Sequence, residues 1–164
     1  MRRTISCIVR NHFGVLAHVA GLFSARGFNI ESLTVAKTDD PVFSRMTIVT
    51  EGDDAIVEQI RKQLGKLIDV IKVHDLSGVD VVERDLMLVK IHTPAGSRVE
   101  IMQMVAAFEG KVVDISPKDL MVEIAGPENK IDAFVRLIRP FGIKGLACTG
   151  RVTLSLGPTM AGEP

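Results

Sequence analysis

TISCIVRNHFGVLAHVAGLFSARG, residues 4–27, places an apolar strand directly before an amphipathic helix. Residues 4–9 alternate polar and apolar side chains, with Ile8 added on the polar side, which is typical of a strand with one face in a core. From Val15 onward, apolar side chains recur at helical spacing, and Gly27 is a plausible end of that helix. The stretch therefore predicts a strand and a helix joined by a short polar loop.

The following residues continue this pattern with two strands, a helix and a closing strand. Residues 29–37 and 44–50 are rich in β-branched residues and flank Thr-Asp-Asp-Pro at 38–41, which predicts a hairpin. Gly-Asp-Asp at 52–54 offers helix-capping side chains, and a strand is expected at 70–74. The apolar face of the second helix is expected to contain Ile56, Ile60, Leu64 and Leu67 or Ile68.

The same order of elements begins again after the polar break at 77–80. Strands are expected at 86–92, 111–116, 120–125, 143–148 and 152–156. The two helices of this repeat are expected to bury Ile101, Met102, Val105 and Phe108, and Ile131, Phe134, Val135 and Ile138. We predict an α+β protein of two tandem ferredoxin-like βαββαβ modules. The expected boundaries are domains at 1–76 and 85–157, a linker at 77–84 and a flexible tail at 158–164.

Charge and composition argue against several classes of partner. Twenty Lys and Arg balance twenty Asp and Glu among 164 residues, and Trp and Tyr are absent, so neither a basic field nor stacking residues favour nucleic acid. The first apolar stretch is too short for a signal peptide or a membrane span, so a cytoplasmic protein is expected. Cys7 and Cys148 lie in apolar segments and are interpreted as buried thiols in a reducing compartment.

The loop Asn11-His12-Phe13-Gly14-Val15-Leu16 has the most distinctive chemistry in the chain. Gly14 allows close approach of the backbone, and the N–H groups of Gly14, Val15 and Leu16 would face an anion from a helix N-terminus. The Asn11 amide both donates and accepts hydrogen bonds, which suits an amino acid with adjacent carboxylate and ammonium groups. The alternative is purely structural, with Asn11 as a helix cap and Gly14 as a turn residue.

Other chemistry is less favoured by the sequence. Four histidines (His12, His18, His74 and His92) are scattered without metal-ligand spacing, so no metal site is predicted. Residues 45–49 lack the aromatic side chains with which RNA-recognition folds stack bases. An acylphosphatase-like hydrolase, with Arg10 and Asn11 at a phosphate, is an alternative on this fold, but no catalytic set accompanies these residues.

Each module of about 75 residues is small for an independent core, so a partner is expected. With both helices on one side of a sheet, the opposite face or an edge strand is left to solvent or a partner, and Ile8 on the off-core face points to one. We therefore expect a homodimer formed through the first module.

Several runs of residues in the chain resemble the pattern of a known family. Asn11-x-x-Gly14-Val15-Leu16, followed by GLFSARGFNIESLTV at 21–35, resembles the ACT domain of the small, regulatory subunit of acetolactate synthase. TDDP at 38–41, SRMTI at 44–48, QIRKQLGKL at 59–67 and ERDLMLVK at 83–90 extend the resemblance, so both modules are covered.

The resemblance implies a subunit that is not an enzyme on its own and holds no cofactor. It implies a catalytic large subunit, with thiamine diphosphate, Mg²⁺ and FAD, that forms acetolactate. It further implies activation of that subunit and feedback inhibition by a branched-chain amino acid, usually valine, bound between ACT domains of a homodimer. Asn11 and the amides of Gly14, Val15 and Leu16 would hold the effector, and Asn29 and Ile30 of the neighbouring subunit would complete the pocket. The alternative is a free-standing ACT-type amino-acid sensor for another enzyme.

Overall fold

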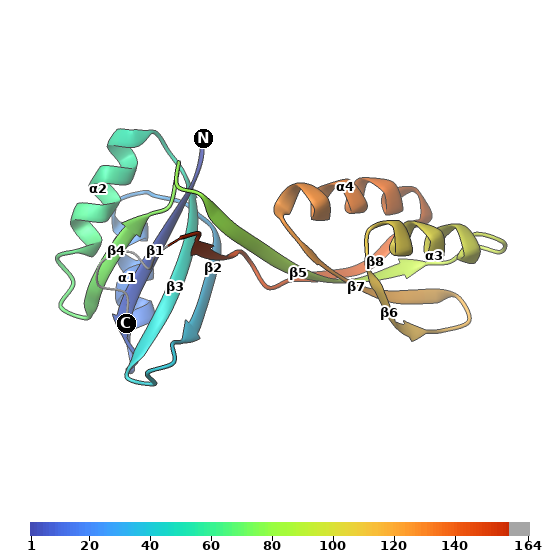
Figure 1. The fold of residues 1–164 in the computed structure, drawn as a ribbon, viewed down its shortest axis with the longest axis horizontal. Coiled ribbons are helices and arrows are strands. Elements are labelled where there is room, and N and C mark those ends of the chain that lie inside the picture. The colour runs from blue at the N-terminus through green and yellow to red at the C-terminus, as the bar shows by residue number, and fades with distance from the viewer. Residues whose placement is uncertain (158–164) are drawn as a thin grey trace. The chain divides into compact units, whose positions relative to one another are not determined.

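The computed structural model describes residues 1–157, and the expected tail at 158–164 lies outside the described residues. The chain forms two compact units. The first contains Met1–Val82 together with the segment that begins at Arg151, and the second contains Glu83–Gly150. Each unit has its own sheet, helices and core (Figure 1).

The first unit is a four-stranded antiparallel sheet with the strand order β2-β3-β1-β4. Its elements in chain order are β1 (Arg2–Arg10), α1 (Val15–Ala25), β2 (Ile30–Lys37), β3 (Phe43–Glu51), α2 (Asp54–Leu64) and β4 (Val70–Asp75). Because β2 is an edge strand, its outer backbone groups pair with no other strand of the described chain. This arrangement confirms the predicted βαββαβ order.

The core of the first unit lies between the sheet and the two helices. Val15, Val19 and Phe23 of α1 are buried there, as are Ile60 and Leu64 of α2. Asp53 caps α2 as expected, because its side chain accepts a hydrogen bond from the Ile56 N–H at 2.9 Å. The helical periodicity of the sequence thus identified the packed faces of both helices.

The second unit repeats this architecture with the strand order β6-β7-β5-β8. Its elements are β5 (Val81–His92), α3 (Arg98–Ala107), β6 (Lys111–Ile115), β7 (Asp119–Gly126), α4 (Glu128–Ile138), the short 3₁₀ helix η1 (Arg139–Phe141) and β8 (Ile143–Cys148). Figure 1 shows α3 and α4 on one side of the sheet. Their buried side chains meet those of β5 and β7 in a separate core.

A last strand, β9 (Val152–Ser155), pairs with β5. The segment around it returns to the first unit, where the Arg151 N–H donates to Ser32 Oγ at 3.2 Å and Arg151 Nη1 donates to Thr4 Oγ1 at 3.1 Å. β5 itself begins at Val81 and so takes in part of the expected linker. The two units are therefore not two consecutive halves of the chain. The pairing of β9 with β5 brings the segment that begins at Arg151 back to the first unit.

Three expectations about burial were wrong. Cys148 is exposed because β8 is the edge strand of its sheet, whereas Cys7 is buried as expected. Met102 is 42% exposed because the neighbouring Ile101 is the residue that faces the core. Ile8 is 1% exposed within one chain, so its burial needs no second molecule. Burial in the interior raises the pKa of the Cys7 thiol to about 12.

Candidate functional site

The loop between β1 and α1 has an open backbone. Gly14 immediately precedes α1 with a φ of +87°, a left-handed conformation that glycine adopts without strain. An added Cβ at this position would meet no atom within 4 Å, so the space beside Gly14 is empty. The backbone at Gly14 is therefore not covered by other atoms on this side.

The start of α1 lacks a side-chain cap. The first helical hydrogen bond runs from the His18 N–H to the Gly14 carbonyl at 3.0 Å. The N–H groups of Val15 and Leu16 precede it, and such groups have no carbonyl partner within their own helix. Together with the helix dipole, they form a positive end that favours a carboxylate.

Asn11 fastens this loop to the turn between β2 and β3. Its N–H donates to the Val42 carbonyl at 2.7 Å, and its side-chain Nδ2 donates to the Pro41 carbonyl at 2.9 Å. Asn11 therefore does not act as the N-cap of α1, which was the structural alternative for this residue. The Oδ1 atom of the amide keeps its capacity to accept a hydrogen bond.

Two neighbouring residues of the loop lie close to the predicted site, and the contact that His12 makes was not predicted from the sequence. His12 Nε2 lies 2.8 Å from Asp69 Oδ1, and Phe13 is 97% exposed at the tip of the loop. The Arg10 N–H also donates to the Asp69 carbonyl at 2.8 Å. No sequence signal identifies this contact, because Asp69 follows His12 by 57 residues.

Asn29 and Ile30 do not join the loop within one chain. Ile30 pairs with Thr50 of β3, and Thr50 pairs with Arg3 near the start of β1. The loop follows Arg10 at the other end of β1, so the two groups are separated by about 23 Å along the strand. One chain thus carries the predicted site in two separate parts.

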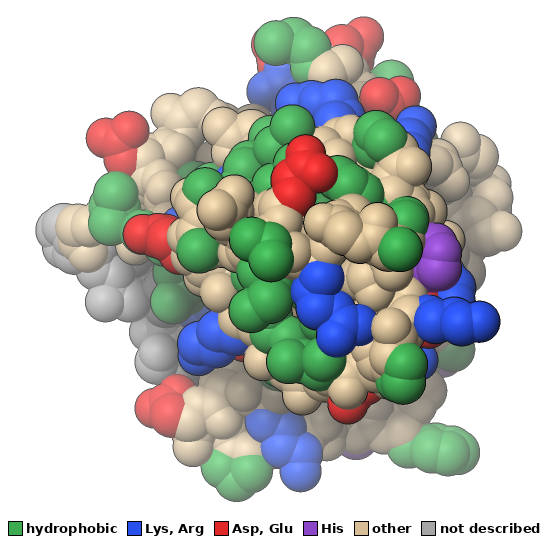
Figure 2. Space-filling model, turned by 90° about the vertical axis from the view of Figure 1, so that its right-hand side faces the viewer, with side chains coloured by type: hydrophobic (Ala, Val, Ile, Leu, Met, Phe, Trp, Pro, Cys, Tyr) green, Lys and Arg blue, Asp and Glu red, His purple; other side chains and the backbone are tan. Residues whose placement is uncertain are grey.

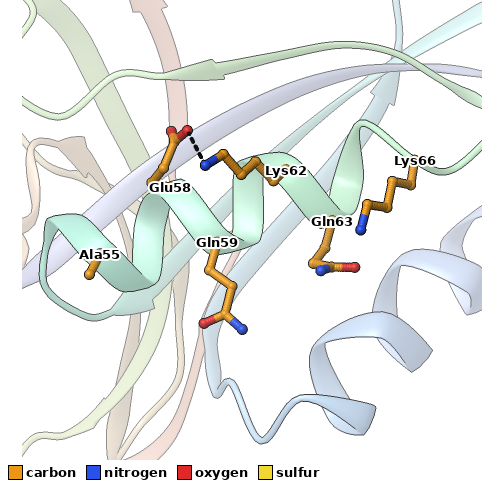
Figure 3. A pocket seen from close by; sticks show the side chains of 6 residues that line it. All are labelled: Ala55, Glu58, Gln59, Lys62, Gln63 and Lys66. Carbon is orange, nitrogen blue, oxygen red and sulfur yellow. Dashed lines mark ion pairs between the residues drawn. The ribbon is translucent and has the colours of Figure 1, made fainter.

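A shallow hollow lies along the exposed face of α2, outside this loop (Figure 3). It is lined by Ala55, Glu58, Gln59, Lys62, Gln63 and Lys66. The hydrogen bonds from Arg61 and then from Lys62 lower the pKa of Glu58 to about 2. The Glu58 carboxylate is thus paired with two cations of its own helix.

The second unit has a surface hollow of its own, lined by residues of β5, β7 and β8: Leu88, Val89, Lys90, Met121, Lys144, Gly145, Leu146 and Ala147. Figure 2 looks at this unit from one end and shows hydrophobic side chains interspersed with basic and acidic ones. Among residues 1–157 there is no cluster of three or more His, Cys, Asp or Glu side chains able to hold a metal ion. No described helix combines the length and the apolar character needed to cross a membrane.

Known families match both units. Residues 5–72 match the AHAS small subunit-like ACT domain, and residues 84–157 match the family described as the small subunit of acetolactate synthase. These two matches span most of both ferredoxin-like modules, the first from within β1 to within β4 and the second from within β5 to residue 157.

Individual relatives match over almost the whole chain. The acetolactate synthase isozyme 3 small subunit of Escherichia coli is 48% identical over 158 residues, which cover 96% of this chain and 97% of that protein. The acetolactate synthase small subunit of Aquifex aeolicus is 47% identical over 154 residues, 93% of this chain and 80% of that protein. The crystal structure of the Thermotoga maritima small subunit is similar, with a TM-score of 0.88 at 37% identity, covering 97% and 99% of the two chains.

Proposed function

Because the chain belongs to the family of acetolactate synthase small subunits, we propose that it activates a catalytic large subunit and makes it sensitive to valine. The catalytic reaction, which uses thiamine diphosphate, Mg²⁺ and FAD, takes place on that large subunit. The observation that carries the proposal is the uncapped start of α1 beside Gly14, in a chain whose family pairs a small with a large subunit.

Valine suits this loop chemically. Its carboxylate matches the N–H groups of Gly14, Val15 and Leu16, and its ammonium group matches the Asn11 carbonyl oxygen. The exposed side chains of Leu16 and Phe13 provide apolar surface for the aliphatic end of the ligand. The loop supplies only one side of a pocket, however, because Gly14 opens to empty space.

A second copy of the chain supplies the other side. The Lys37 end of β2 lies at the same end of the sheet as Arg10, because both ends pair with neighbouring residues of β3, Ser44 and Phe43. If two β2 strands pair antiparallel about a two-fold axis, Ile30 of the second copy comes next to Lys37. Asn29 and Ile30 of one copy then share a sheet end with the Asn11–Leu16 loop of the other.

Inhibition requires that valine bind more tightly to one arrangement of the dimer than to another. Equal affinity for the activating and the inactive arrangement would shift no equilibrium. A difference of about 1–3 kcal/mol is the usual range of allosteric coupling. This difference in affinity is expected to arise at the dimer interface, because the affinity of a ligand bound by both copies depends on their relative position.

The proposal is tested by reconstitution with a catalytic large subunit. Addition of this protein is expected to raise the rate of acetolactate formation, and valine is expected to reverse the gain. The Asn29→His variant should keep the activation and lose the response to valine, whereas Asn129→His on α4 serves as the matched control and should keep both. A large subunit whose activity stays unchanged by this protein would contradict the regulatory assignment.

A further inference from the structure

Each of the two ring nitrogens of His12 lies within hydrogen-bond distance of an acceptor oxygen. Its Nε2 lies 2.8 Å from Asp69 Oδ1, and its Nδ1 lies 3.0 Å from the carbonyl oxygen of Phe13. An ionised carboxylate and a carbonyl group have no proton to donate. The two contacts are both hydrogen bonds only when each ring nitrogen carries a proton, which is the imidazolium form.

These two bonds define the path of the loop. One ties residue 12 to the segment between α2 and β4, and the other turns the Phe13 peptide immediately before Gly14. Loss of one proton leaves one ring nitrogen as an acceptor facing another acceptor, so one bond must break. The orientation of the N–H groups at the start of α1 depends on this peptide.

We infer that protonated His12 is a positioning residue for the effector site, fixing the β1–α1 loop and adding positive charge beside the bound carboxylate. The inference rests on the proposed function, since the carboxylate is that of the amino-acid effector. His12 acts through the loop and through its field, without contact to the ligand.

The charged surroundings of His12 agree with this assignment. The hydrogen bond to the Phe13 carbonyl and then that to Asp69 raise the pKa of His12 above its ordinary value of 6.5, whereas the charge of Arg10 on β1 acts against them. His18 of α1 also faces Asp69, with Nδ1 3.9 Å from Oδ2. The stabilisation from the protonated form is therefore complete below about pH 6.5 and is lost as the pH rises through the raised pKa.

Two measurements on the full-length protein test the inference. The first is a ¹⁵N NMR titration of the histidine rings without effector, in which His12 should show protons on both nitrogens up to a pH above its ordinary pKa. The second is calorimetry of valine binding, which should be about threefold to tenfold tighter at pH 6 than at pH 8. His12→Gln should bind weakly and lose this dependence on pH.

Two variants separate positioning from a general structural effect. Asp69→Asn removes the carboxylate while keeping its shape, so the pH midpoint of valine affinity should move downward. His92→Gln, at a histidine of the second unit that pairs with Asp119 at 3.4 Å, should leave the profile unchanged.

The outcomes also separate this inference from the function on which it rests. Valine binding that is equally tight at both pH values, or a His12→Gln protein with the wild-type profile, overturns the role of His12 and leaves the effector site standing. Absence of valine binding at either pH overturns the proposed site, and the role of His12 with it.

Discussion

The β1–α1 loop of the first unit and the β5–α3 loop of the second occupy the same place in the same fold. Each precedes the first helix of its module and contains a glycine with positive φ, +87° at Gly14 and +84° at Gly96. Each also binds the following hairpin turn through its backbone, because the Asn11 N–H donates to Val42 and the Thr93 N–H donates to Lys118. The backbone frames are thus similar, although α1 begins directly after Gly14 and α3 begins after Ser97.

The side chains make the two loops different. In the second unit, Arg98 Nη2 donates to the carbonyls of Ser116 at 2.7 Å and Pro117 at 2.9 Å, and Ser97 Oγ donates to Pro94 at 2.8 Å. Arg98 and Ser97 thus bond to carbonyl groups within the second unit, although α3, like α1, lacks a side-chain cap. The first loop differs in presenting an exposed Phe13 beside Gly14. The fold therefore repeats the position of the loop, and the side chains of the two loops differ.

The largest expected difference comes from placing a carboxylate at each glycine. Gly14→Asp should raise the valine concentration for half-maximal inhibition about a hundredfold, because like charges brought together in an interface cost several kcal/mol. Gly96→Asp is the matched control, since its φ and free space are nearly identical and the backbone strain is therefore the same. Inhibition assays of the reconstituted enzyme measure both, and equal loss of valine sensitivity in the two variants would argue against a site at Gly14.

A smaller difference in valine inhibition is expected from replacing the side chains that hydrogen-bond each loop to its hairpin turn. Asn11→Ala should weaken valine inhibition about tenfold, through loss of one ligand contact and of the hydrogen bond to Pro41. Arg98→Ala should leave inhibition unchanged. Titration of the reconstituted enzyme with valine compares the two, and an Arg98 variant that is the more resistant would reverse the assignment of the sites.

Stability should show the opposite ranking. Arg98→Ala removes a guanidinium from two carbonyl groups and should lower the free energy of unfolding by about 1–2 kcal/mol, whereas Asn11→Ala should cost about 0.5–1 kcal/mol. Thermal unfolding of the isolated protein gives this comparison. A larger loss for Asn11→Ala would mean that the first loop is the more firmly built of the two.

The smallest effect concerns the exposed ring at the tip of the first loop. Phe13→Ser should change the preference among valine, leucine and isoleucine about threefold with little change in stability, since the ring is 97% exposed in one chain. Competition in the calorimetric binding assay measures the preference. Unchanged selectivity would place Phe13 away from the aliphatic end of the ligand.

Much of the fold was predictable because local patterns agree with tertiary structure. The spacing of Val15, Val19 and Phe23 marked a buried helix face, and Asp53 marked a helix start. Cys148 was misjudged because an apolar strand sequence does not reveal that the strand lies at a sheet edge. The return of Arg151 to Ser32 was equally invisible, since 119 residues separate them.

The candidate site, like the fold, was predictable from the sequence only in part. The openness of Gly14 followed from sequence, because a glycine before a helix is a local signal. The contact between His12 and Asp69 did not, because it depends on how α2 and β4 place a distant carboxylate. The proposed pairing of two copies is also beyond a single sequence, and it uses the outer edge of β2, which pairs with no other strand among residues 1–157.

The most direct test of a site shared between two copies is complementation between Asn11→Ala and Asn29→Ala chains. Each variant alone should form dimers with two damaged sites, whereas a mixed dimer contains one intact site built from the unaltered halves. Calorimetry after unfolding and refolding the variants together should therefore recover tight valine binding at up to about one site per mixed dimer. Mixed dimers that bind no better than either variant alone would contradict the account.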